Sequence, residues 1–135
     1  MRYVHKVQYY ETDQMKIVHH SNYIRWFEET RVYMMEQMGL GYGKMEEMGI
    51  ISPVMAINAE YKSMCRFPDI VNIDGVVSEF NGVKMVVSYT VRDSVTGEVR
   101  CKGESTHCFL DSNGKLIRMD RAYPEIYQML KGLME

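Results

Sequence analysis

The sequence has little of several features that mark special classes of protein. Proline occurs only three times in 135 residues, and there is no repeat or low-complexity segment, so nothing suggests a linker between domains. The three cysteines, Cys65, Cys101 and Cys108, are an odd number without the spacing of a metal site. No apolar run approaches the roughly 20 residues of a membrane-spanning helix. We therefore expect a single domain, residues 1–135, that folds around an ordinary core.

The charges also lack a strong excess of one sign. Sixteen Lys and Arg residues oppose 18 Asp and Glu residues, which gives a net charge of −2. The sequence therefore lacks the excess of positive charge that is typical of nucleic-acid-binding proteins, so we expect no nucleic-acid partner. The segment Met1–Lys6 has no apolar core of a signal peptide, and the cysteine content suits a reducing compartment. A cytoplasmic protein without a membrane span is the natural expectation.

Methionine, by contrast, is abundant, with 13 residues. Its unbranched thioether side chain fills irregular gaps and repacks easily. Met34, Met35 and Met38 can therefore fill gaps in a core around a helix. They can equally form a deformable apolar pocket wall that accepts varied acyl groups, and the sequence does not separate these two interpretations.

The longest helical pattern covers Tyr23–Met38. Ser21 or Asn22 is a suitable N-cap for this helix, and Gly39 or Gly41 is a suitable residue to end it. Most charged residues lie away from an apolar stripe that repeats at intervals of three and four residues. The stripe consists of Tyr23, Phe27, Met34 and Met38, with Ile24 and Met35 beside them. Such a helix is expected to pack one face against a sheet.

Strands and turns account for most of the remaining chain. The first strand is expected at Tyr3–Tyr9, and strands with alternating apolar residues are expected within Pro53–Met119. Asn81-Gly82 predicts a two-residue hairpin turn, and consecutive strands joined by tight turns form an antiparallel sheet. Two shorter helices are expected at Gly43–Met48 and Pro124–Met134. The expected fold class is α+β, with a long central helix covered by a five- or six-stranded antiparallel sheet.

The segment from Tyr10 to Tyr23 carries the chemistry that the sequence makes most visible. It contains a carboxylate, Asp13, in a short polar loop, and it leads into the start of the long helix. The N–H groups and the positive dipole end of a helix N-terminus stabilise an oxyanion. A carboxylate that faces such a helix start can attack a carbonyl carbon or activate a water molecule. This arrangement favours the hydrolysis of a carbonyl compound.

This segment resembles the hotdog-fold acyl-CoA thioesterases of the 4-hydroxybenzoyl-CoA thioesterase-like superfamily. The resemblance rests on Asp13, Ile17-Val18, His19-His20 and Asn22-Tyr23, and the later segment Tyr61–Asp69 also fits the family. It implies a hotdog fold, in which the sheet wraps the long helix. The family is built from dimers whose sheets pair edge to edge, often as tetramers. The resemblance therefore also implies a homodimer or homotetramer with the site at the subunit interface.

The resemblance also implies roles for individual residues. Asp13 would be the catalytic carboxylate, either as a nucleophile that forms an acyl-enzyme anhydride or as a general base on water. The backbone N–H of His20 would bind the thioester carbonyl at the helix start. The acyl group and the CoA phosphates would be contacted by Ile17, Val18, His19, Tyr23, Trp26, Arg66 and Lys84, with Lys62 as a further candidate for the phosphates. No metal or redox cofactor is implied, because coenzyme A enters as part of the substrate.

Lys16 departs from the family pattern, which usually has glycine at this position. Glycine adopts a positive φ without strain and leaves room for a ligand. A lysine here can change the path of the loop, narrow the pocket or offer a cation to the substrate. It therefore leaves open a protein that binds acyl-CoA without hydrolysing it.

Other interpretations of the same residues also stay open. Asp13 can be a loop residue that closes an Asx-turn or caps the helix. The adjacent pair His19-His20 has no acidic or Cys partner at ligand spacing, so no metal site is expected. An acyl-CoA dehydratase or isomerase would need Glu28 to work with His20. The primary expectation is an acyl-CoA thioester hydrolase that releases a carboxylic acid and free CoA.

Overall fold

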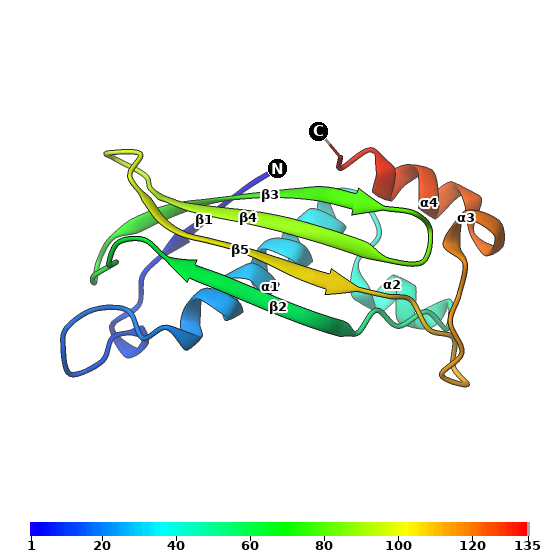
Figure 1. The fold of residues 1–135 in the computed structure, drawn as a ribbon, viewed down its shortest axis with the longest axis horizontal. Coiled ribbons are helices and arrows are strands. Elements are labelled where there is room, and N and C mark those ends of the chain that lie inside the picture. Colours follow the sequence, from blue (N-terminus) through cyan, green and yellow to red (C-terminus); the bar gives the residue numbers. More distant parts are fainter. Residues whose placement is uncertain (135) are drawn as a thin grey trace.

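A computed structural model describes residues 1–134, and Figure 1 shows one long helix, α1, lying across one face of a sheet. The strands are β1 (Arg2–Lys6), β2 (Val54–Tyr61), β3 (Ile70–Phe80), β4 (Met85–Asp93) and β5 (Val99–His107). The helices are the 3₁₀ helix η1 (Tyr9–Glu11), α1 (Ser21–Gln37), α2 (Tyr42–Glu47), α3 (Met119–Ala122) and α4 (Pro124–Lys131). Among residues 1–134, no helix is both long enough and apolar enough to cross a membrane.

The five strands of the sheet lie in the order β1-β3-β4-β5-β2. Every neighbouring pair is antiparallel. A turn at Asn81-Gly82 joins β3 to β4 as predicted, and Gly82 has a φ of +92° there. The loop is longer than the expected two residues, because Phe80 pairs with Met85 and residues 81–84 lie between them. The Asn81 side chain stabilises this turn, because its Oδ1 accepts the N–H groups of Val83 and Lys84 at 2.9 and 2.8 Å. The expected α+β class is confirmed, and the sheet has five strands.

Two glycines let α1 lie close to the sheet. A Cβ atom on Gly103 of β5 would come within 2.5 Å of the Phe27 ring, and one on Gly75 of β3 would come within 2.6 Å of the Met34 sulfur. Phe27 also stacks on Tyr89 of β4, with ring centroids 4.4 Å apart and 8° between the ring planes. A larger residue at either glycine would push the helix away from this close-packed layer. Tyr23, Phe27, Met34 and Met35 of the predicted stripe are therefore buried, whereas Ile24, which was expected beside it, is exposed.

The boundaries of α1 differ from the expectation at its start. His20 occupies the N-cap position, and no side chain forms a capping hydrogen bond. Ser21 and Asn22 were expected to cap the helix, but their side chains are used elsewhere. The Ser21 hydroxyl lies 2.8 Å from Nδ1 of His19, and Asn22 Nδ2 donates to the Glu11 carbonyl at 2.8 Å. The end of α1 is as expected, since Gly39 follows it with a φ of +75°.

The remaining boundaries differ at both ends of the chain. The first strand was expected to reach Tyr9, but β1 ends at Lys6 and the chain then turns into η1. The second short helix begins at Tyr42, close to the expected start. The C-terminal helix begins at Pro124 as expected but ends at Lys131, before the expected Met134, and the four-residue helix α3 precedes it.

Four polar residues form a hydrogen-bonded chain inside the core. Arg31 Nη1 donates to the Tyr89 hydroxyl at 3.2 Å, and this hydroxyl lies 2.7 Å from Oγ of Ser105. The same Oγ lies 2.7 Å from Nε2 of His107. Burial, and then the nearby positive charge of Arg31, lower the pKa of His107 to about 4. His107 is therefore a neutral core residue at neutral pH.

The lowered pKa of His107 predicts that stability falls in mild acid. An unfolded histidine has a pKa of about 6.5, so between pH 6.5 and about 4 the unfolded chain binds one more proton than the folded chain. The free energy of unfolding should be highest above pH 6.5 and should fall by about 2 kcal/mol from pH 7 to pH 5. Urea unfolding at the two pH values measures this difference. His107→Gln should lose most of this pH dependence of stability, whereas the exposed control His19→Gln should keep it. An undiminished pH dependence in His107→Gln would show that His107 is not its source.

Candidate active site

Residues 13–17 form a small hairpin loop in front of α1. The Asp13 N–H donates to the Ile17 carbonyl at 2.9 Å, and the Lys16 N–H donates to the Asp13 carbonyl at 2.9 Å. Asp13 Oδ1 also accepts the N–H of Met15 at 2.8 Å, which closes an Asx-turn. The Asx-turn considered from the sequence is therefore present. It uses only one of the two carboxylate oxygens.

Lys16 occupies the left-handed position at the end of this turn, with a φ of +64°. A hairpin loop of this length commonly ends in a left-handed residue, and glycine is favoured there because it has no Cβ atom. The left-handed conformation costs an L-residue roughly 1–2 kcal/mol in free energy. Lys16 thus adopts the backbone conformation for which glycine is suited, so the lysine does not prevent the turn.

Glu11 lies just before this loop and is a buried carboxylate, 4% exposed. Its Oε2 accepts from Trp26 Nε1 at 2.6 Å, and its Oε1 accepts the Gln8 N–H at 2.7 Å and lies 2.8 Å from His5 Nε2. Burial by itself would raise the pKa of this carboxyl group, but the hydrogen bonds from Gln8, His5 and Trp26 together hold the pKa of Glu11 below its ordinary value. Sequence reasoning missed this residue, because nothing in a polar segment indicates that its acid will be buried.

The backbone of Glu11 also connects the loop to the start of α1. Its carbonyl accepts the His19 N–H at 2.9 Å and the Asn22 side chain at 2.8 Å. The His20 carbonyl accepts from the Tyr61 hydroxyl at 3.1 Å. Within residues 1–134, no acceptor is found for the N–H of His20. The helix start is therefore held in place while this N–H group remains available.

A cleft of about 280 Å³ lies between the loop, the start of α1 and the segment that follows β2. It brings together six of the residues predicted for the site, namely Asp13, Ile17, Val18, His20, Tyr23 and Lys62. The cleft is completed by Met15, Tyr61, Ser63 and Met64. Residues 61–64 lie far from Asp13 in the sequence. Of these four residues only Lys62 was expected at the site, and the family resemblance of Tyr61–Asp69 did not indicate the other three.

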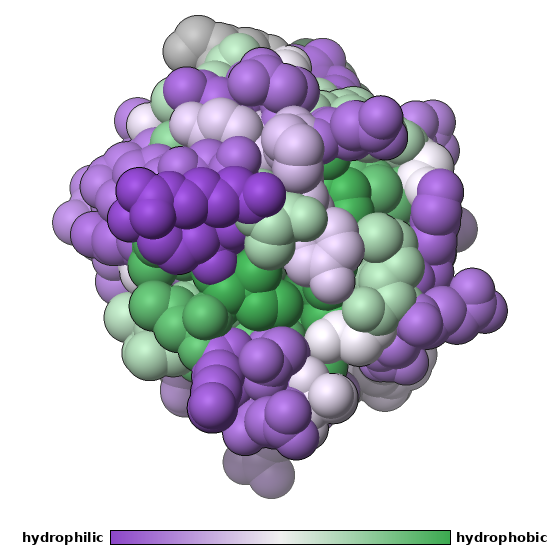
Figure 2. Space-filling view, turned by 90° about the vertical axis from the view of Figure 1, so that its right-hand side faces the viewer, coloured by the Kyte–Doolittle hydropathy of each residue, from purple (hydrophilic) through white to green (hydrophobic). Residues whose placement is uncertain are grey.

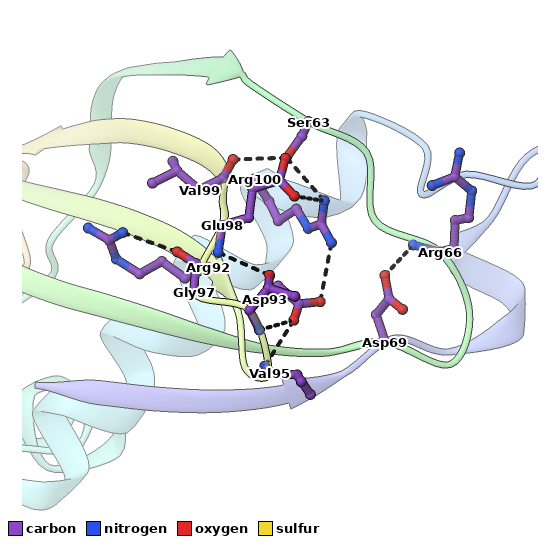
Figure 3. Close-up of polar contacts among 11 residues, drawn as sticks. Ser63, Arg66, Asp69, Arg92, Asp93, Val95, Gly97, Glu98, Val99 and Arg100 are labelled. Atoms are coloured by element: carbon purple, nitrogen blue, oxygen red, sulfur yellow. Dashed lines mark hydrogen bonds and ion pairs between the residues drawn. The ribbon is translucent and has the colours of Figure 1, made fainter.

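Arg100 of β5 holds the wall formed by residues 61–64, and Figure 3 shows its guanidinium beside Ser63. The Arg100 carbonyl accepts the N–H groups of Lys62 and Ser63 at 2.8 and 3.1 Å. Its guanidinium donates to Oγ of Ser63 and to Oδ2 of Asp93, both at 3.2 Å. Asp93 also accepts two backbone N–H groups of the β4–β5 turn, and these bonds, followed by Arg100, hold the pKa of its carboxyl group below the ordinary value. This network fixes one side of the cleft.

Two of the predicted substrate-binding residues are turned away from the cleft. Trp26 is fully buried and donates to Glu11, so it supports the loop from inside the core. His19 is exposed, and its Nδ1 lies 2.8 Å from the Ser21 hydroxyl while its ring packs at a tilt of 30° against the ring of His20. Neither side chain is among those that line the cleft.

Of the three candidates for the CoA phosphates, Lys62 lines the cleft, whereas Arg66 and Lys84 lie outside it. Arg66 follows the wall segment, and its backbone N–H donates to Asp69 at 2.9 Å while its exposed side chain extends away from that bond (Figure 3). Lys84 lies at the β3–β4 turn, at the opposite end of the sheet from the Asp13 loop (Figure 1). Its Nζ is 3.8 Å from Glu79. Within one chain, Arg66 is thus near the cleft and Lys84 is remote from it.

The alternative chemistries find no support in this geometry. Burial raises the pKa of Cys65 to about 11 and that of Cys101 to about 12, so both remain thiols at neutral pH. Glu28 is exposed on the outer face of α1, beside Glu29, and does not line the cleft that contains His20. Among residues 1–134, no three His, Cys, Asp or Glu side chains are grouped so that they could hold a metal ion.

The fold and this site define the class of protein. The profile of the thioesterase-like superfamily matches residues 7–130. The chain therefore belongs to the thioesterase-like superfamily, and it has the hotdog fold of the 4-hydroxybenzoyl-CoA thioesterase-like proteins. The family resemblance inferred from the Asp13–Tyr23 motif is confirmed.

Particular relatives share nearly the whole length of the chain. A Bacillus subtilis (strain 168) protein named "Putative acyl-CoA thioesterase YneP" is 35% identical over 121 residues, which cover 89% of this chain and 87% of that protein. The structure of DHNA-CoA thioesterase from Staphylococcus aureus is similar with a TM-score of 0.90 and 30% identity, and the match covers 97% of this chain and 88% of that one. A hypothetical protein from Aquifex aeolicus has a TM-score of 0.88 and 32% identity, with 96% and 98% of the two chains covered.

The left-handed conformation of Lys16 predicts that Lys16→Gly stabilises the protein. Glycine removes the strain but has more freedom in the unfolded chain, so the free energy of unfolding should rise by only about 0.5–1 kcal/mol. Urea unfolding measures the change. Gln14→Gly is the control, because Gln14 lies in the same loop without a positive φ and glycine should destabilise there. Equal destabilisation by both substitutions would show that Lys16 does not adopt this conformation in solution.

Proposed function

We propose that this protein is an acyl-CoA thioesterase, which hydrolyses a thioester to a carboxylic acid and free CoA. The observation that carries the proposal is the cleft that Asp13 shares with His20 and Tyr23 at the start of α1. Membership of the thioesterase-like superfamily supports the same reaction. So do the names of the relatives from Bacillus subtilis and Staphylococcus aureus, which refer to acyl-CoA and DHNA-CoA.

The thioester carbonyl would lie at the start of α1, with its oxygen directed to the N–H of His20. In the general-base route, Asp13 takes a proton from water while the water oxygen bonds to the carbonyl carbon. In the nucleophilic route, a carboxylate oxygen of Asp13 bonds to that carbon, and water later hydrolyses the anhydride. In both routes the carbonyl electron pair moves to oxygen and returns as the C–S bond breaks, so CoA leaves as a thiolate. Each route needs one carboxylate and one oxyanion site.

The surroundings of Asp13 suit either role. The Asx-turn holds Oδ1 through the Met15 N–H. Within residues 1–134, Oδ2 has no hydrogen-bond partner, so this oxygen is available to water or to the thioester. The turn also limits the rotation of the side chain, and such preorganisation lowers the cost of reaching a reactive geometry.

The CoA portion would extend from the cleft past residues 61–66. Lys62 lines the cleft, and its Nζ pairs with Glu60 at 2.8 Å. Arg66 is exposed, and its guanidinium forms no ion pair with the described residues. These two cations are the candidates for the phosphates of CoA within one chain. Lys84 would contribute to the same cleft only from a second subunit.

The assembly we propose is a homo-oligomer that pairs through β2. This strand is at the edge of the sheet, and seven of its eight residues are exposed. The exposed residues include Met55 at 63% and Tyr61 at 46%, and Met64 beyond the strand is 52% exposed. An exposed apolar edge strand favours association with another chain, because its unpaired N–H and C=O groups can form hydrogen bonds with a second strand. A partner paired here would lie directly beside the cleft.

The first test of the function is Asp13→Asn. The amide keeps the Oδ1 acceptor of the Asx-turn but removes the negative charge, so we expect thioester hydrolysis to fall by about 100-fold or more without a change in fold. Release of free thiol from a panel of short, long and aromatic acyl-CoAs measures the rate. Asp111→Asn is the matched control, because Asp111 Oδ1 accepts the N–H groups of Asn113 and Lys115 in a similar turn outside the cleft. Full activity in Asp13→Asn would contradict the proposed mechanism. If wild type hydrolysed none of the panel, the proposed activity would be wrong.

The proposed assembly predicts that a charge on β2 separates the subunits. Met55→Glu should convert the wild-type oligomer into a single chain, because it puts a charge on the edge that pairs. Size-exclusion chromatography with light scattering measures the mass. Val95→Glu is the control, since Val95 is 90% exposed but lies in the β4–β5 turn. A wild-type mass equal to one chain, or an unchanged oligomer in Met55→Glu, would rule out pairing through β2.

A further inference from the structure

A second candidate site lies farther along α1, away from Asp13. Arg31 comes eight residues after Tyr23, which is about 12 Å along a helix. It is only 8% exposed. Its Nη1 donates to the Tyr89 hydroxyl at 3.2 Å and to Oγ of Ser105 at 3.5 Å. Among residues 1–134, its Nε has no hydrogen-bond partner and no carboxylate pairs with it.

Among residues 1–134, the positive charge of Arg31 therefore has no paired carboxylate. Its hydrogen-bonding neighbours are hydroxyl groups. His107, which follows them in the same chain of hydrogen bonds, is neutral because burial lowers its pKa to about 4. An unpaired charge is costly to remove from water, and a hydrogen-bonded anion offsets that cost. A planar guanidinium matches the two oxygens of a carboxylate particularly well.

Arg31 lines a small cavity of about 20 Å³ that also touches α2, α4 and the sheet. The other polar lining residues are Tyr42 and Ser52, and most of the remaining lining is apolar. Three methionines contribute to it: Met34, Met35 and Met85. Figure 2 views the molecule from the end where α2, α3 and α4 lie, and shows apolar residues gathered in the middle of this face with polar residues around them.

We propose that this cavity binds the carboxylate of a short aliphatic acid. The carboxylate would pair with Arg31 and accept hydrogen bonds from Tyr42 and Ser52, while the alkyl chain would lie among the methionines. A volume of about 20 Å³ holds roughly one water-sized group, which is less than a carboxylate with an alkyl chain occupies. Binding therefore requires the flexible thioether side chains of the lining methionines to move apart, and nucleotides and phosphate esters would need a far larger displacement. The site is separate from the Asp13 cleft, and the proposal does not depend on hydrolysis there.

Thermal unfolding of the whole protein in sodium propionate or butyrate, compared with sodium chloride at equal ionic strength, tests the proposal. A ligand that binds only the folded state raises Tm in a saturable manner. We expect both carboxylates to raise Tm in this way, and chloride and the neutral propionamide to have no such effect. Calorimetric titration with propionate should give one site per chain. Arg31→Met, which removes the charge at similar volume, should weaken this binding at least about tenfold.

Three further variants separate the proposal from its alternatives. Arg25→Met is the matched control, because Arg25 is an exposed arginine on the same helix and should leave binding unchanged. Asp13→Asn should also keep propionate binding, which would exclude the Asp13 cleft as the site. If Arg31→Met does not fold, Leu133→Trp serves instead, since it should fill the cavity and abolish binding. Equal stabilisation by chloride and propionate, or undiminished binding in Arg31→Met or Leu133→Trp, would overturn the proposal.

Discussion

Glu11 puts a negative charge inside the core, where a carboxylate without partners would be strongly destabilising. Its partners are the Trp26 indole, the Gln8 N–H and the His5 ring, at 2.6 to 2.8 Å. The carbonyl of the same residue binds the His19 N–H and the Asn22 side chain. One residue therefore holds both the base of the Asp13 loop and the first turn of α1. The relative position of the carboxylate and the helix start depends on this contact.

Glu11 and Arg31 are both buried and charged, but they differ in how their hydrogen-bonding groups are satisfied. Glu11 has hydrogen bonds to both of its carboxylate oxygens, and it acts as a rigid support for the loop. Arg31 is nearly as buried, but its bonds go to hydroxyl groups and its Nε has no partner in residues 1–134. A fully satisfied buried charge is explained by the fold itself. An incompletely satisfied one indicates strain, an ordered water or a ligand, and a ligand is what we propose for the cavity beside Arg31.

Prediction from sequence succeeded where the signal was local. The spacing of apolar residues predicted α1, the Asn81-Gly82 pair predicted the β3–β4 turn, and Gly39 marked the end of the helix. The N-cap was wrong because Ser21 and Asn22 bond to His19 and Glu11. Those bonds depend on how η1 lies against α1, which no local pattern encodes.

The sequence by itself determined the α+β class, the motif from Asp13 to Tyr23 and the family, because these depend on periodicity and on residues close together in the chain. Tertiary structure alone decided which distant residues complete the cleft. Residues 61–64 reach Asp13 because Arg100 of β5 holds their backbone, and Trp26 turns inward because Glu11 is buried beside it. Burial and long-range hydrogen bonds follow from the packing of the whole chain. They separate the residues that line the cleft from those that only support it.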